Sequence, residues 1–241
     1  SELSVLREAL ERLGQGSGGI VCLIGEAGMG KSRLIDESHG EWKQIAGNDA
    51  SWFESHGVSY DTTRPYGLFL QRVLQIFGIG DNDSMELVRE KVATIPPDLP
   101  PDVHVRVVGA IEALLAVGSD PARPQLQGAA LQKEVYGAFH SMLRAAASSA
   151  PTVAVLDDLH WADPASVDLL IDVLPLVDEV PLLLVCGFRP ERQSPAWRVK
   201  QTAETDYPHR YREIALRALS DEDSDALFES LLNIADSPPQ L

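Results

Sequence analysis

The chain has 241 residues, of which 44% are hydrophobic, a composition that suits a globular domain with a substantial buried core. Its 20 Lys and Arg residues are outnumbered by 36 Asp and Glu residues, which gives a formal net charge of -16. Such an acidic chain offers no broad positive field for a phosphate backbone, so we expect no direct contact with nucleic acid. The longest apolar run, Leu182 to Phe188, is too short to span a bilayer, and we expect no membrane segment.

The two cysteines, Cys22 and Cys186, each lie inside an apolar run. This setting is typical of buried free thiols and not of a disulfide framework or a zinc site. A reducing, cytoplasmic location is therefore expected.

The first quarter of the chain predicts a helix, a strand, a helix and a second strand. Leucines at helical spacing in residues 3–13 indicate an N-terminal helix that ends in the glycine-rich residues 14–19. Residues 20–24 are continuously apolar, which is the pattern of a strand buried on both faces of a parallel sheet. A helix over residues 33–45 and a weaker strand over residues 50–55 follow.

Three further apolar runs predict a third strand at residues 153–156, a fourth at 182–186 and a weaker fifth at 211–216. The segment between the second and third strands is mostly helical in pattern and too long for a simple crossover connection. We therefore expect a helical insertion over about residues 64–127, ahead of a crossover helix at 129–147. Strands that alternate with helices favour a three-layer α/β fold with a parallel sheet.

Residues 25–32, GEAGMGKS, match the phosphate-binding pattern G-x-x-x-x-G-K-[ST]. Glycines let the backbone curl so that its N–H groups point at the β-phosphate, and the helix that follows presents its positive end to the same oxygens. Lys31 would bridge the β- and γ-phosphates, and Ser32 would offer its hydroxyl to Mg²⁺. The alternative is a glycine-rich turn with an exposed lysine. The expected contacts to ATP or ADP, with GTP less favoured, are Gly25, Glu26, Ala27, Gly28, Met29, Gly30, Lys31, Ser32 and Arg33.

The third predicted strand ends in two acids, Asp157 and Asp158. Asp157 would hold Mg²⁺ through its water shell together with Ser32, and Asp158 would polarise the attacking water. The other interpretation is the start of a solvated loop. Arg189 follows the fourth strand, at the edge where ligands bind in open α/β folds, and either senses the γ-phosphate or is an exposed loop residue.

The residues after the two acids favour structural roles. Asp163 and Pro164 precede an apolar helical pattern, so they are most simply an N-cap and the first residue of a helix. For His160 and Trp161 we favour packing, because a lone histidine without companion ligands makes no metal site.

P-loop ATPases with the catalytic acid on a separate strand place the P-loop strand between the fourth and fifth strands. The chain, residues 1–241, is therefore predicted to be a P-loop ATPase domain with a five-stranded sheet of order 5-1-4-3-2. Cys22 and Cys186 should then lie on adjacent strands and be reduced.

Four strings, GEAGMGKSRL, LDDLHWAD, LLLVCGFRPE and REIALRALSDED, resemble in order and spacing the ATPase modules of the STAND class, which is AAA/NACHT-like. The likeness is to modules in large LuxR-type bacterial transcription regulators and in some class III adenylyl or guanylyl cyclases. RPYGLF, at residues 64–69, also resembles a recurring segment of that class. The resemblance implies ATP phosphates at the P-loop, metal at Asp157, a water-polarising Asp158 and a sensor arginine at Arg189.

The resemblance also implies a regulatory ATPase, in which the ATP or ADP state switches an attached output domain. The lid and effector domains of that class are expected to lie outside this chain. Expected partners are the nucleotide and an effector domain in the same polypeptide, with nucleotide-dependent self-association left open. We expect slow hydrolysis, because Asp158 is one methylene shorter than the Glu of many P-loop ATPases. The alternatives are a P-loop kinase acting on a small molecule, a ring-forming motor and a scaffold that binds nucleotide without hydrolysing it.

Overall fold

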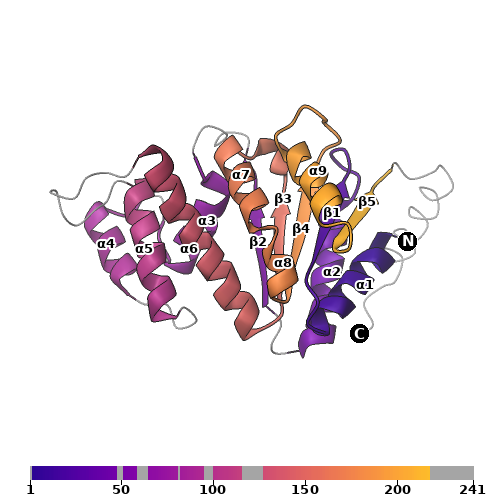
Figure 1. Cartoon of the computed structure of the whole chain (residues 1–241), viewed down its shortest axis with the longest axis horizontal. Coiled ribbons are helices and arrows are strands. Elements are labelled where there is room, and N and C mark those ends of the chain that lie inside the picture. The colour runs from indigo at the N-terminus through magenta and orange to yellow at the C-terminus, as the bar shows by residue number, and fades with distance from the viewer. Residues whose placement is uncertain are drawn as a thin grey trace, which may run out of the picture.

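A computed structural model describes residues 2–47, 51–58, 65–80, 82–94, 100–115 and 127–217 of the chain. They form a parallel sheet with helices on both faces (Figure 1). The strands are β1 Gly19–Ile24, β2 Ser51–His56, β3 Thr152–Asp157, β4 Leu182–Phe188 and β5 Tyr211–Ala215. Their order is β2-β3-β4-β1-β5, and every neighbouring pair is parallel. The predicted fold class and the order 5-1-4-3-2, read from the other edge, are confirmed.

The strand side chains alternate between two hydrophobic cores, one on each face of the sheet. Val21 and Leu23 of β1 point to the face that is covered by α1 Glu2–Gly14 and α2 Lys31–Ala46. Ile20 and Cys22 point to the opposite core. A strand buried on both faces needs apolar residues at successive positions, which explains the continuous apolar runs in β1, β3 and β4.

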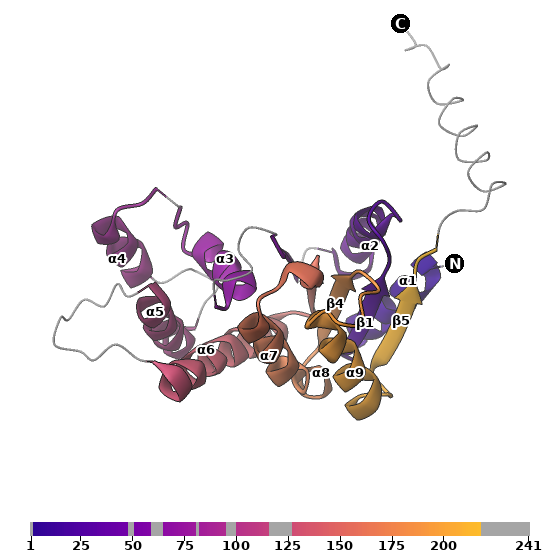
Figure 2. The ribbon, with the colours of Figure 1, turned by 90° about the horizontal axis from the view of Figure 1, so that it is seen from above.

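The second face is covered by the helices that follow β3 and β4. These are α7 Pro164–Val173, α8 Leu176–Glu179 and α9 Ala196–Asp206, and Figure 2 shows them across the sheet from α2. The 3₁₀ helix η2, Leu159–Trp161, joins β3 to α7.

Within the described residues, four helices lie between β2 and β3, on the β2 side of the sheet (Figure 1). They are α3 Gly67–Ile76, α4 Met85–Ala93, α5 Pro101–Leu115 and α6 Gly128–Ser149. Residue 64, where the predicted insertion begins, and residues 116–126 lie outside the described residues. Ser55 at the end of β2 donates its hydroxyl hydrogen to the carbonyl of Leu68, which fixes α3 to the sheet edge.

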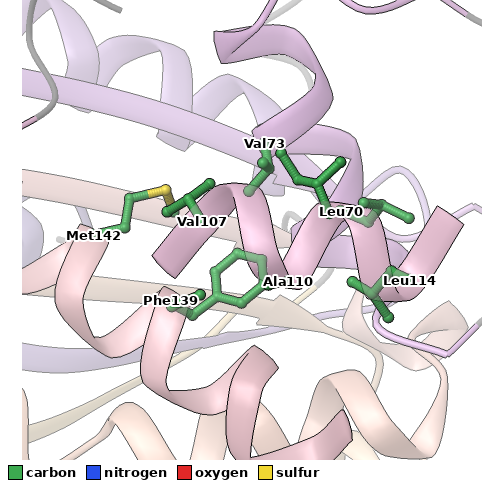
Figure 3. Close-up of a pocket in the computed structure, with 9 residues that line it drawn as sticks. Leu70, Val73, Val107, Ala110, Leu114, Phe139 and Met142 are labelled. Atoms are coloured by element: carbon green, nitrogen blue, oxygen red, sulfur yellow. The ribbon is translucent and has the colours of Figure 1, made fainter. Parts of the chain in front are cut away.

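A small apolar cavity of about 10 Å³ lies where α3, α5 and α6 meet (Figure 3). Its lining is entirely apolar: Leu70, Val73, Val107, Ala110, Ile111, Leu114, Ala138, Phe139 and Met142. A space this small and apolar has no polar partner for a water molecule, so we interpret it as a packing gap and not as a ligand site.

Cys22 and Cys186 are register partners on the adjacent strands β1 and β4, and both are buried free thiols, as predicted. In the described part of the chain, none of the helices has the length and apolar character needed to cross a membrane.

Candidate nucleotide site

The predicted site residues meet at one edge of the sheet. Because all strands are parallel, their carboxyl ends lie at the same edge, which is where open α/β sheets bind ligands. The P-loop follows β1, the pair Asp157 and Asp158 ends β3, and Arg189 follows β4. Since β4 lies between β1 and β3, three segments far apart in sequence form one site.

The P-loop has the backbone conformation that an anion site requires. Gly28 and Gly30 have φ of 79° and 88°, in the left-handed region where a glycine avoids the steric clash of a Cβ atom. Gly30 is the N-cap of α2, and within the described ranges no side chain caps this helix. The first helical hydrogen bond runs from Leu34 N to Gly30 O at 2.9 Å. The N–H groups of Lys31, Ser32 and Arg33 at the start of α2 therefore remain available to phosphate oxygens. Two N–H groups earlier in the loop are already used: Met29 N donates to Glu26 O at 3.3 Å, and Gly25 N donates to Phe188 O at 3.2 Å.

The Lys31 side chain is held by backbone carbonyl groups of the P-loop. The residue is 7% exposed, and its Nζ donates to the carbonyl oxygens of Gly25 at 2.7 Å and Glu26 at 3.2 Å. A buried ammonium group needs such acceptors, and it has three hydrogens to donate. These two carbonyl contacts therefore leave capacity for a phosphate oxygen.

The other loop residues are more exposed. Ser32 lies on the surface at the start of α2. Arg33 Nε donates to Glu37 Oε1 at 2.8 Å, an ion pair one turn along the helix. A contact from Arg33 to phosphate would therefore come from its backbone N–H. Glu26, Ala27 and Gly28 are exposed, and Met29 is half-buried.

Asp157 is a buried acid, 3% exposed, at the end of β3. Its Oδ1 accepts a hydrogen bond from the backbone N–H of Asp158 at 2.8 Å. Burial raises the pKa of Asp157, and the positive charge of Lys31 opposes part of that rise. The described residues contain no group of three or more His, Cys, Asp or Glu that could hold a metal ion. Mg²⁺ is commonly held by one or two carboxylates together with phosphate oxygens and water, and the buried acid beside Lys31 fits that role.

Gly187 on β4 makes room for the Asp157 carboxylate. A Cβ atom on Gly187 would lie 2.2 Å from Asp157 Oδ1 and 3.0 Å from its Cγ. This role of Gly187 was not predicted from the sequence, although a glycine inside a buried apolar strand is a signal of close approach.

Asp158 begins η2 with a left-handed backbone, φ 53°, which is unusual for a residue other than glycine. Gly57, just after β2, packs closely against the backbone of Asp158. Gly57 N donates to Asp157 O at 2.9 Å, and a Cβ atom on Gly57 would come within 2.3 Å of Asp158 O. Residues held in this region cost about 1–3 kcal/mol and cluster at functional sites. The role of Gly57 was not predicted from the sequence.

Arg189 is placed next to the same segment. Its guanidinium carbon lies 5.8 Å from the centroid of the Trp161 ring, within the range of a cation–π contact. The Trp161 ring in turn lies 5.0 Å from the imidazole of His160. These rings pack, as expected, but Trp161 is 37% exposed, so its packing is incomplete.

Asp163 is the N-cap of α7, as predicted, with its Oδ1 accepting from Ser166 N at 2.9 Å. The same carboxylate also accepts from the backbone N–H groups of Tyr66 at 3.1 Å and Gly67 at 3.2 Å. Asp163 is 4% exposed. It therefore joins the start of α3 to the segment that carries the two acids, a link that the capping pattern did not reveal.

Comparisons with known proteins place the chain in a family. A family model described as "AAA ATPase domain" matches residues 1–185. An uncharacterized protein of Rhizobium meliloti (strain 1021) is 26% identical over 200 residues, which cover 80% of this chain. This chain spans 18% of the length of that relative. The structure of VirB4 of Thermoanaerobacter pseudethanolicus is similar at 15% identity with a TM-score of 0.36, covering 89% of this chain and 80% of that one.

Proposed function

Because the chain belongs to the AAA ATPase domain family, we propose that it is a slowly hydrolysing regulatory ATPase module whose ATP or ADP state switches an output domain in the same polypeptide. The observation that carries the proposal is that the buried Asp157 carboxylate and the start of α2 meet at one edge of the sheet, where Lys31 is near enough for its charge to lower the pKa of Asp157. The Lys31 ammonium group and the free N–H groups at the start of α2 suit the phosphates of ATP, and the Asp157 carboxylate suits the metal that accompanies them.

In this proposal the loop from Gly25 to Arg33 binds the phosphates through those of its backbone N–H groups that have no acceptor among the described residues. Lys31 turns from its carbonyl partners to the β- and γ-phosphate oxygens. Ser32 and Asp157 would hold Mg²⁺, which would supply positive charge to stabilise the phosphates during hydrolysis.

Asp158 polarises the attacking water. The water oxygen forms a bond to the γ-phosphorus while the bond to the β,γ-bridging oxygen breaks, so ADP leaves with the bonding electron pair. The proton of the water passes to the Asp158 carboxylate and from there to solvent or phosphate. Arg189, at the edge beside Trp161, responds to the γ-phosphate.

Slow turnover follows from the short side chain of Asp158. A misplacement on the order of 1 Å can reduce the rate roughly a hundredfold, so we expect turnover far below the enzyme median of about 10 per second. Slow hydrolysis suits a switch, because the ATP state must persist while the output domain responds. The resemblance to STAND modules supports the regulatory role, and self-association in the ATP state belongs to the same proposal.

Titration calorimetry with Mg²⁺-ATP tests the binding site. Lys31→Ala should lower the affinity sharply, whereas Lys43→Ala, the same charge change in the exposed last turn of α2, should not. Equal affinity in the parent and Lys31→Ala would reject the site.

A phosphate-release assay tests the chemistry. Asp158→Asn should abolish the residual hydrolysis and retain ATP binding, while Asp36→Asn on the exposed surface of α2 should change neither. Fast turnover by the parent, or unchanged turnover by Asp158→Asn, would show that the catalytic acid is another residue.

A further inference from the structure

His160 carries buried polar atoms that the described residues leave without hydrogen bonds. Its side chain is 2% exposed, and neither Nδ1 nor Nε2 has a hydrogen-bond partner in the described part of the chain. A buried donor or acceptor left in this condition costs roughly 1–3 kcal/mol, so its retention in a native protein requires an explanation.

The position of the ring suggests where the missing partner lies. His160 Nδ1 is 3.8 Å from Asp158 Oδ1, which is about 1 Å longer than a hydrogen bond. The Asp158 carboxylate is 43% exposed and accepts no hydrogen bond within the described ranges. A buried group that can donate therefore lies next to a carboxylate that has no protein donor among the described residues.

The ring is suited to donate as a neutral group. Burial lowers the pKa of His160, and the positive charge of Arg189 lowers it further. A neutral imidazole has one N–H donor and one acceptor nitrogen, so protonation at Nδ1 presents the donor to Asp158. Packing against Trp161 restrains the orientation of the ring.

The short side chain of Asp158 needs such a partner. Its left-handed backbone fixes where the side chain starts, but nothing described fixes where its oxygens point. A carboxylate that activates water must stay within hydrogen-bond reach of it, about 2.6 to 3.2 Å.

We propose that His160 is a positioning residue for ATP hydrolysis, whose Nδ1–H donates to the Asp158 carboxylate and holds it toward the attacking water. An approach of about 1 Å forms this bond. The inference rests on the role proposed above for Asp158 and adds the group that orients its carboxylate.

Three substitutions of His160 distinguish the effect of losing its N–H donor from the effect of losing the volume of its ring. His160→Leu fills similar space without a donor, His160→Asn keeps an N–H donor near the place of Nδ1, and His160→Gln keeps one near the place of Nε2. We expect His160→Leu to lower kcat roughly a hundredfold with KM and Kd for ATP unchanged. His160→Asn should recover much of the loss and His160→Gln little of it. His140→Leu, on the half-buried surface of α6, is the matched control, and a melting curve for each variant reports whether the fold is intact.

A second measurement does not depend on turnover. Long-range ¹H–¹⁵N spectra of ¹⁵N-histidine protein, bound to Mg²⁺ and a non-hydrolysable ATP analogue, should show the His160 proton on Nδ1. Asp158→Ala should remove that preference, and His160→Asn identifies the signal.

The outcomes distinguish this inference from the proposed function. A parent that binds ATP and hydrolyses it through Asp158, together with a folded His160→Leu of normal kcat, would overturn the role of His160 alone. Equal loss in the folded Leu and Asn variants, or a proton on Nε2 in the nucleotide complex, would do the same. A parent that does not bind Mg²⁺-ATP would overturn both.

Discussion

Replacing Gly187 by alanine should disable the proposed metal site without changing any group proposed to touch the nucleotide. The added Cβ atom would lie 2.2 Å from Asp157 Oδ1, whereas its distance to the Asp157 Cα atom would be 3.4 Å. The backbone of β3 can therefore stay in place while the carboxylate has to move by about 1 Å to restore normal contact. Such a displacement of a metal ligand should lower kcat by on the order of a hundredfold, and overpacking should destabilise the fold by about 1–3 kcal/mol.

The assay is phosphate release as a function of Mg²⁺ concentration, with urea unfolding of the same samples. Gly187→Ala should need more Mg²⁺ and reach a lower maximal rate. Gly40→Ala is the control, because a Cβ atom at this exposed position in α2 would meet nothing within 4 Å and should stabilise the helix by roughly 1 kcal/mol. If folded Gly187→Ala had the parent's Mg²⁺ dependence and kcat, the Asp157 carboxylate would not be a metal ligand.

Two further changes test buried acids, one in the candidate site and one at the helix cap that follows it. Asp157→Asn should raise the melting temperature in Mg²⁺-free buffer, because it removes a buried charge but keeps the oxygen that accepts from the next residue; a lower melting temperature would mean that Lys31 already compensates the charge. Asp163→Ala should lower the free energy of unfolding by roughly 3 kcal/mol, since it removes a helix cap and leaves the N–H groups of Tyr66 and Gly67 unpaired. Ser84→Ala, which removes only the cap of α4, should cost about 1 kcal/mol in the same urea titration.

The sheet was predictable from sequence because burial on both faces leaves a clear pattern. The apolar runs at residues 20–24 and 153–156 are the cores of β1 and β3, each one residue short at one or both ends. The fourth strand was predicted to end at Cys186, but it continues through Gly187 to Phe188. A glycine weakens a strand pattern in sequence, whereas here it is kept for its small size beside Asp157.

The parts of the site that sequence analysis found are local, and the parts that it missed are contacts between distant segments. Glycine spacing and a lysine within eight residues predict a P-loop on their own. Gly57 and Gly187 have no such pattern, because their role is to leave space for Asp157 and Asp158 on another strand. Asp163 is a recognisable N-cap, yet its bond to Tyr66 joins residues 97 positions apart.

This last contact shows why two separate strings of the sequence belong together. The segment RPYGLF contains Tyr66 and Gly67, and the backbone N–H groups of both donate to Asp163 of DLHWAD. Tyr66 has a left-handed backbone, with φ 61°. Gly67 is the first residue of α3. Asp163 lies shortly after η2, the 3₁₀ helix that contains His160 and that Asp158 caps. A displacement of α3 must therefore either break these buried hydrogen bonds, at about 1–3 kcal/mol for each unpaired group, or move η2 with it. These hydrogen bonds give the inserted helices contiguous contacts to the segment that carries the proposed catalytic acid.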